Sequence, residues 1–181
     1  MGGKAARNKG NNYELRIAHI LSDKFKRNFR RVPRSGAWDK QSFTGDIYCK
    51  EYFVFSIECK NQKVLNLRPW IDQAAEDASI SGKEPCVIFH INRCNKYPNG
   101  DDFICLKIED LDYYTNERYA LNDYTYEICW KLHDWLEDDS IVVKYNRQDY
   151  AILRLDEFLE IITVKRVKKP IWSALKPYLI P

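Results

Sequence analysis

The stretch from Thr44 to Lys63 constrains this chain most, because it has the pattern of two β-strands joined by a short turn. From Tyr52 to Lys60 the residues alternate with a period of two, as in a strand whose two faces differ. One face carries residues that suit a core, namely Phe53, Phe55, Ile57 and Cys59, whereas the other carries Val54, Ser56, Glu58 and Lys60. The pattern therefore projects a carboxylate and an ammonium group side by side from one strand.

Asp46 lies on the preceding strand, directly after Gly45. Carboxylates on two neighbouring strands would offer the hard oxygen ligands that divalent cations prefer. A lysine beside them would offer positive charge to a phosphate under attack. The alternative interpretation is a solvated hairpin face on which these residues have no catalytic role.

The register of this hairpin decides between the two interpretations, because residues directly opposite each other point to the same side of a sheet. A two-residue turn would place Asp46 opposite Phe55, on the core face. A three-residue turn, residues 50–52, would place Asp46 opposite Ser56, with Glu58 as its diagonal neighbour about 7 Å away. A catalytic hairpin therefore requires an odd-length turn or a bulge.

Length and composition indicate one intracellular, soluble domain. The chain has 181 residues, no apolar run of membrane-spanning length and no apolar signal segment at its N-terminus. Its six cysteines include no Cys-x-x-Cys pair, so we expect reduced thiols rather than zinc ligands or disulfides.

Charge is distributed unevenly along the chain. Residues 1–40 contain eleven Lys or Arg and three Asp or Glu, whereas residues 101–140 contain three and twelve. This separation fits a polyanion bound at one end of the molecule, although two solvated faces would give the same counts.

Residues 11–25 have helical periodicity, with Glu14 on the inward, apolar stripe; residues 1–9 precede it as a basic arm. A buried carboxylate needs a partner. That partner would be Arg16 or Lys60 in a structural role, or a metal-bound water in a functional one.

A basic loop with Ser35 and Gly36 then leads into the hairpin, and its arginines could grip phosphates in bidentate fashion. Further along we expect a Gln73-bearing helix over residues 66–81 and a central strand over 86–91, in which His90 is a core or rim residue rather than a base. The remaining predicted elements are strands at 103–107 and 149–155, helices at 109–116, 127–137 and 156–162, and a basic tail from 165.

In this order the segments resemble the PD-(D/E)xK nuclease superfamily, and more narrowly the archaeal-type Holliday junction resolvases and their relatives from bacterial viruses. The likeness covers residues 8 to about 92 and is carried by Asn8-Lys9-Gly10-x-x-x-Glu14, Arg34-Ser35-Gly36-Ala37-Trp38, Gly45-Asp46-Ile47, Ile57-Glu58-Cys59-Lys60, Trp70-x-x-Gln73-Ala74 and Ser81-Gly82-Lys83-x-Pro85. The chain departs from the pattern in its acidic stretch, about 94–145, which is longer than we expect in a compact resolvase.

The resemblance implies an α/β, restriction-endonuclease-like fold, with a mixed central sheet flanked by helices and an acidic insertion. It implies one nuclease domain over residues 1–181, with a core of about 8–92 plus 146–164, an insertion of about 94–145 and a basic tail of 165–181.

The resemblance also implies roles for individual residues. Asp46 and Glu58 would bind Mg²⁺, with Mn²⁺ substituting and the Cys59 carbonyl as a further ligand. Lys60 would orient the attacking water, and Glu14 would reach the metal directly or through water. Ser35 would touch the scissile phosphate, and DNA would be held by Arg7, Lys9, Arg30, Arg31, Arg34 and Gln73.

The implied function is cleavage of branched DNA, most specifically of four-way junctions, leaving a 5′-phosphate. A homodimer would present two symmetric sites. Backbone contacts would make binding salt-sensitive. The protein would act in the cytoplasm, of the host if it is viral. Two alternatives remain: a restriction-like or repair nuclease with another DNA shape preference, and a catalytically silent DNA-binding module.

Overall fold

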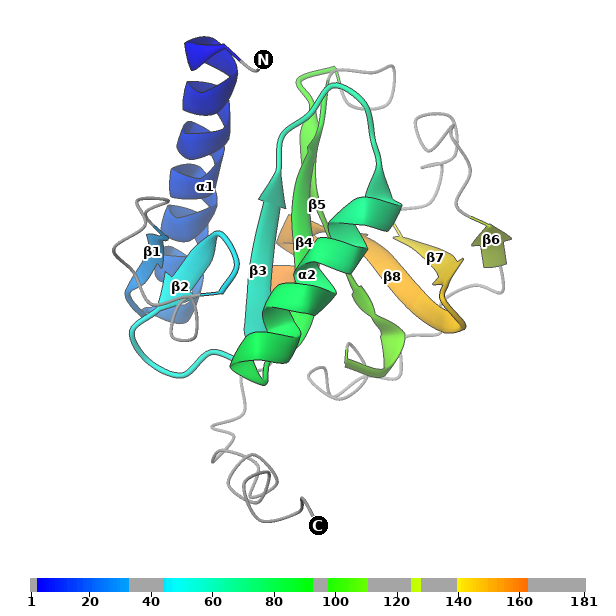
Figure 1. Ribbon diagram of the computed structural model, residues 1–181. Helices are drawn as coiled ribbons and strands as arrows, with labels where there is room; N and C mark the ends of the chain where they lie inside the picture. Colours follow the sequence, from blue (N-terminus) through cyan, green and yellow to red (C-terminus); the bar gives the residue numbers. More distant parts are fainter. Residues whose placement is uncertain (1–2, 33–43, 93–97, 111–124, 128–139, 163–181) are drawn as a thin grey trace.

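The computed structural model describes residues 3–32, 44–92, 98–110, 125–127 and 140–162 (Figure 1). Its elements in chain order are α1 (Lys4–Phe25), β1 (Phe29–Arg31), β2 (Ile47–Cys49), β3 (Phe55–Lys60), α2 (Leu67–Ser81), β4 (Glu84–Ile91), β5 (Asp101–Lys107), β6 (Thr125–Glu127), β7 (Ser140–Tyr145), β8 (Gln148–Arg154) and α5 (Leu155–Ile161).

The strands of the described residues form a single mixed sheet in the order β1-β2-β3-β4-β5-β8-β7-β6. Strands β3 and β4 run parallel, because α2 carries the chain back across the sheet between them, and β6 and β7 are also parallel. The other neighbouring strands are antiparallel. The predicted mixed central sheet flanked by helices is therefore confirmed.

Helices cover both faces of the sheet. On one face, Ile17 of α1 and Phe158 of α5 share a core with Ile57 and Ile88 of the central strands. On the other face, which α2 covers (Figure 1), Trp70 packs in a second core that includes Phe89. Consecutive residues of β4 thus alternate between two cores, which explains its continuous apolar sequence.

Several element boundaries differ from those expected from the sequence. Helix α1 begins at Lys4, so residues 4–9, predicted as an arm, are its first turns. Residues 125–127 form strand β6, although a helix was predicted from 127. The rest of that predicted helix, and residues 111–116 of the one before it, lie outside the described residues. The helix over 66–81 is confirmed as α2, which ends at Ser81 and is capped by Gly82.

The acidic segment contributes directly to the sheet. Strand β5 lies between β4 and β8, with Phe103 opposite Phe89 on one side and opposite Arg154 on the other. Strands β6 and β7 extend the same sheet to its edge. This part of the chain therefore supports the strands that carry the predicted site. The described cysteines, at 49, 59, 86 and 105, are free thiols.

Candidate active site

Buried polar side chains mark one region of the molecule. Six polar or charged residues are buried in the described part of the chain, and five of them come from α1, β3 and the segment that enters β2: Glu14, Thr44, Asp46, Ser56 and Glu58. The sixth, Asp110, follows β5. Burial of polar groups costs free energy unless they find partners, so this concentration needs a structural or a chemical explanation.

Gly45 sets the position of Asp46. Its φ of +77° lies in the left-handed region, and a Cβ there would come within 2.6 Å of the Ile57 carbonyl oxygen. This close approach lets the Asp46 amide donate a hydrogen bond of 2.7 Å to the same oxygen. The Cys59 amide in turn donates to Asp46 Oδ2 at 2.9 Å. A residue larger than glycine at position 45 would separate Asp46 from β3.

The connection between the two hairpin strands has an odd number of residues, as a catalytic hairpin requires, but the strands pair in a different register from the one considered above. Ile47 pairs with Ile57, so the register extended by one residue places Asp46 opposite Glu58 rather than opposite Ser56. Residues 50–54 connect the two strands, a connection of five residues instead of three. Because both lengths are odd, Asp46 still belongs to the side of the sheet that carries Glu58.

Glu58 is buried, and it forms an ion pair with Lys60. Glu58 is only 1% exposed, which contradicts the alternative of a solvated hairpin face. The Lys60 ammonium donates to Glu58 Oε1 and, at 2.8 Å, to Gln73 Oε1 on α2. Burial and then the negative charge of Asp46 raise the pKa of Glu58 to about 7, against the opposing effect of the Lys60 hydrogen bond. The pKa of Glu58 therefore reflects its burial and the neighbouring Asp46 more than its hydrogen bond with Lys60.

Glu14 is buried as predicted, but its partner is neither Arg16 nor Lys60. Arg31 Nε donates to Glu14 Oε2 at 2.8 Å, and its other end contacts Asn11 Oδ1 at 3.3 Å. Arg31 comes from β1, which lies beside α1 (Figure 1). Arg31, which was predicted to bind phosphate, is thus hydrogen-bonded to the Glu14 carboxylate on α1.

Sequence reasoning missed Asp77, which lies on α2 one turn beyond Gln73. Burial raises the pKa of Asp77, a hydrogen bond from the Gly45 backbone lowers it, and the charge of Asp46 raises it further. Gln73 and Asp77 thus join α2 to both strands of the hairpin. Their spacing of four residues, which puts both on one face of a helix, was the signal that could have identified Asp77.

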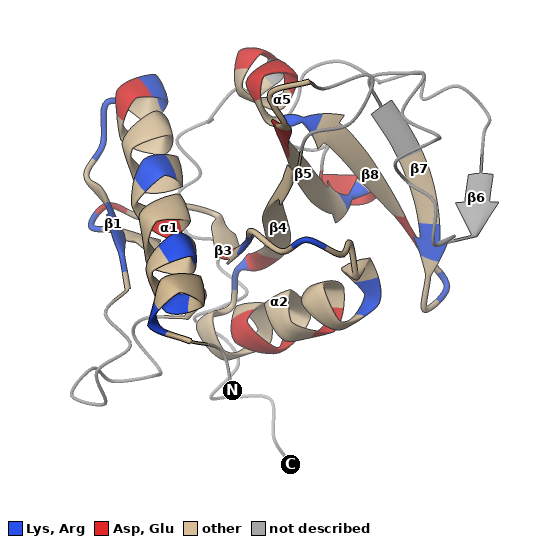
Figure 2. Ribbon diagram, turned by 90° about the horizontal axis from the view of Figure 1, so that it is seen from above, with Lys and Arg blue, Asp and Glu red and all other residues tan. Residues whose placement is uncertain are grey.

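The residues predicted to bind DNA have different surroundings. Arg7 and Lys9 lie on the exposed first turns of α1, along whose ribbon Lys and Arg positions recur (Figure 2). Arg30 is exposed on β1 and donates to Asn28 Oδ1 at 2.9 Å. Arg34 and Ser35 lie outside the described residues.

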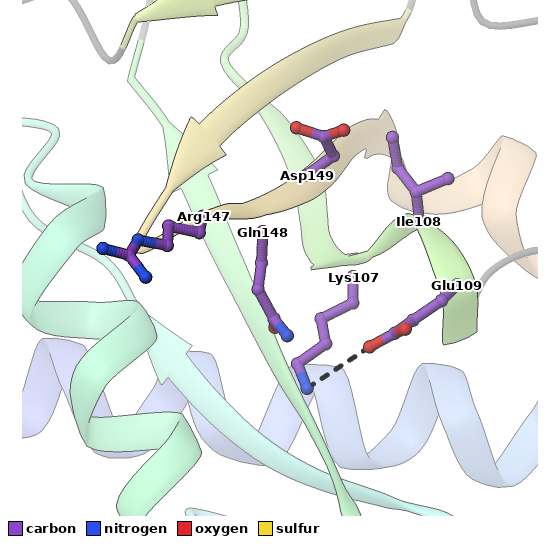
Figure 3. A pocket seen from close by; sticks show the side chains of 6 residues that line it. All are labelled: Lys107, Ile108, Glu109, Arg147, Gln148 and Asp149. Atoms are coloured by element: carbon purple, nitrogen blue, oxygen red, sulfur yellow. Dashed lines mark ion pairs between the residues drawn. The ribbon is translucent and has the colours of Figure 1, made fainter.

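A hollow lies two strands or more from β3 in the sheet order. It has a volume of about 330 Å³ and is lined by Lys107, Ile108, Glu109, Arg147, Gln148 and Asp149, between the end of β5 and the β7–β8 turn (Figure 3). Two cationic and two anionic side chains line it, and Lys107 pairs with Glu109 at 3.6 Å. This balanced lining gives no preference for a polyanion.

The donor set around Asp46 fits a divalent cation. Within the described ranges no group of three or more His, Cys, Asp or Glu side chains is arranged to hold a metal ion. Asp46 and Glu58 form a pair of carboxylates with hard oxygen atoms, and a cation between them would offset the burial and the charge of Asp46 that raise the pKa of Glu58.

A mixed sheet between helices, with an aspartate at the start of one strand and Glu-x-Lys on the next, defines the class of PD-(D/E)xK nucleases on a restriction-endonuclease-like fold. The chain matches the family model described as "Phage putative PDDEXK endonuclease" over residues 5–168, and it belongs to this family. Neither the curated proteins nor the solved structures gave a match. No helix among the described residues is long and apolar enough to cross a membrane.

Proposed function

We propose that this protein is a metal-dependent endonuclease that cleaves branched DNA, with the four-way Holliday junction as its principal substrate. The observation that carries the proposal is the buried Glu58–Lys60 ion pair beside Asp46. Mg²⁺, or Mn²⁺ in its place, would supply a Lewis acid and lower the pKa of the attacking water. Asp46 and Glu58 would hold it, together with the Cys59 carbonyl.

The chain's own residues divide the remaining work. Lys60, held by Glu58 and Gln73, orients the attacking water and places positive charge beside the phosphate. Glu14 approaches the same centre from α1, directly or through water, and Ser35 contacts the scissile phosphate. The cleaved strand is left with a 5′-phosphate.

DNA is held through its backbone by the basic region that includes Arg7, Lys9, Arg30 and Arg34. Gln73 and Arg31, whose polar atoms are engaged within the site, contribute by holding Lys60 and Glu14. A homodimer presents two such sites to a four-way junction. The setting is the cytoplasm of the phage's host.

The alternative of a catalytically silent DNA-binding module fits the burial poorly. Removing one partner of a buried ion pair typically costs roughly 3–5 kcal/mol, and apolar replacements of similar size are often as stable as the pair itself. A binding module would gain nothing from Glu58 and Lys60 that an apolar pair could not provide.

One gel tests the proposal. Purified protein is incubated with Mg²⁺ and end-labelled four-way junction, splayed arm, duplex or single strand, each with a metal-free lane. We expect Mg²⁺-dependent cuts that are fastest on the junction. Preferential cutting of plain duplex would favour a restriction-like or repair nuclease, and binding without any cut would favour the silent module.

A further inference from the structure

A second cluster of charged residues lies outside the proposed machinery and joins α1 to the β4–β5 hairpin. Arg16 of α1 donates two hydrogen bonds to Asp102 of β5, at 2.6 and 2.8 Å, across 86 residues of sequence. His90 of β4 lies opposite Asp102 in the sheet, and its Nδ1 is 2.9 Å from Asp102 Oδ1. One carboxylate thus joins three elements of the fold.

The surroundings of this cluster restrict its motion. The Arg16 guanidinium lies over the Tyr13 ring, 5.1 Å from its centroid, and the Tyr13 and His90 rings are 6.1 Å apart. Gly100 packs against the outer edge of His90, where a Cβ would come within 2.7 Å of Nε2. His90 is therefore enclosed on both ring edges rather than presented to a substrate.

The Arg16–Asp102 pair is buried on the side of Asp102, whereas the Arg16 side chain is 47% exposed. The Asp102 side chain is 13% exposed, and although burial opposes ionisation, the hydrogen bonds from Arg16 and His90 lower its pKa. Because the pair is bidentate, it fixes the orientation of the Arg16 guanidinium as well as its distance from Asp102. The contact is made two residues after Glu14 on α1.

Two contacts therefore hold the part of α1 that contains Glu14. Arg31 of β1 holds its carboxylate directly, and Arg16 with Asp102 holds the same turn of the helix from the side of β5. We infer that Asp102 is a positioning residue, which acts through Arg16 to fix the part of α1 that presents Glu14 to the site. This inference rests on the proposed role of Glu14 in cleavage.

A double-mutant cycle tests the inference on the full-length protein, with single-turnover cleavage of the four-way junction as the readout. Asp102→Asn should slow cleavage by roughly 10- to 100-fold, as expected when a reacting group is displaced by up to about 1 Å. It should also raise the Mg²⁺ concentration needed for half-maximal cleavage. In a Glu14→Gln background Asp102→Asn should change the rate by no more than about twofold. The carboxylate whose position Asp102 is inferred to fix is already absent from that variant.

Asp149→Asn is the matched control. Asp149 is an aspartate on the neighbouring strand β8, and it pairs with Lys144 of β7 at 3.9 Å. We expect wild-type cleavage from it. Arg16→Lys keeps the charge and loses the fork, so it should reproduce a milder form of the Asp102→Asn defect and serves as the test if Asp102→Asn does not fold.

The outcomes separate two failures. If Glu14→Gln cleaves at the wild-type rate, the proposed role of Glu14 is wrong, and the inference fails with it. If Glu14→Gln is impaired, but Asp102→Asn has no effect or slows both backgrounds by the same factor, only the inference is overturned and Asp102 merely stabilises the fold.

Discussion

Glu58 and Asp102 are both largely buried carboxylates, yet their surroundings move their pKa in opposite directions. Glu58 is buried with the carboxylate of Asp46 beside it, and these two effects raise its pKa to about 7 against the hydrogen bond from Lys60. Asp102 has Arg16 and His90 as partners, and its pKa is lowered. Glu58 is therefore a carboxylate whose ionised form is opposed by its surroundings, whereas the ionised form of Asp102 is favoured by its partners. The first suits a cation site, and the second suits a tertiary anchor.

Substitution of the site's carboxylates should give the largest effect. Asp46→Asn or Glu58→Gln removes a ligand charge while leaving the basic surface intact, so we expect cleavage to be abolished and junction binding to be unchanged or tighter. Cleavage assays in Mg²⁺ and binding assays without metal measure the two properties. Glu109→Gln, at an exposed carboxylate near the β7–β8 turn, is the control and should behave as wild type. Full activity of either site variant would show that the metal is held elsewhere.

Loss of Lys60 should follow in size. Lys60→Ala should lower single-turnover cleavage by about 10²–10³, as for the loss of one electrostatic stabiliser, with DNA affinity nearly constant. Removal of its hydrogen bond should also raise the pKa of Glu58 above its present value and move the pH profile of cleavage in the alkaline direction. Lys60→Arg should rescue poorly.

Lys144→Ala provides the matched comparison for Lys60→Ala, because Lys144 pairs with Asp149 at 3.9 Å on an exposed part of the sheet. It should leave cleavage unaltered. If Lys60→Ala also cuts within a few-fold of wild type at saturating Mg²⁺, the ion pair with Glu58 is only structural.

The arginines next to the hairpin should divide into two groups. Arg30→Ala combined with Arg34→Ala should weaken binding to every DNA substrate and flatten the log–log salt dependence by up to about two units. Arg31→Ala should instead slow cleavage with less effect on that slope, because its guanidinium is engaged by Glu14. Arg147→Ala, on the β7–β8 turn, serves as the control. If Arg31→Ala flattened the salt dependence as much per arginine as Arg30→Ala with Arg34→Ala, Arg31 would be a DNA contact.

The smallest expected effect is on stability as a function of pH. Without metal, Glu58 has a folded-state pKa above its unfolded value of about 4.5, so its stabilising contribution is present below pH 4.5 and is lost as pH rises through about 7. For Asp102, whose pKa is lowered, the contribution is present above its unfolded value and is lost in acid. Thermal melts in a chelator should therefore show Glu58→Gln gaining on wild type, by a few degrees at most, as pH rises from about 5 to 8.

Asp102→Asn should show the opposite sign in the same melts. Its deficit should be constant near neutrality and should disappear only in acid. If Glu58→Gln and Asp102→Asn change in parallel between about pH 5 and 8, the contrast between the two carboxylates is wrong.

Local patterns in the sequence were sufficient for much of the site. Alternation along residues 52–60 predicted that Glu58 and Lys60 share a side of β3, and their ion pair confirms it. The helical stripe of residues 11–25 predicted that Glu14 faces inward, and it is buried. Both predictions succeed because the periods of strands and helices are properties of the local backbone.

Tertiary structure decided which groups meet. The five-residue connection between β2 and β3 set Asp46 opposite Glu58, and the sheet edge brought Arg31 to Glu14 in place of the partners expected from sequence. The contact between Arg16 and Asp102 spans 86 residues. Such pairings depend on strand order, register and the packing of α1 against the sheet. Residue type and periodicity determine which side chains face inward, but they do not encode which distant side chain each one meets.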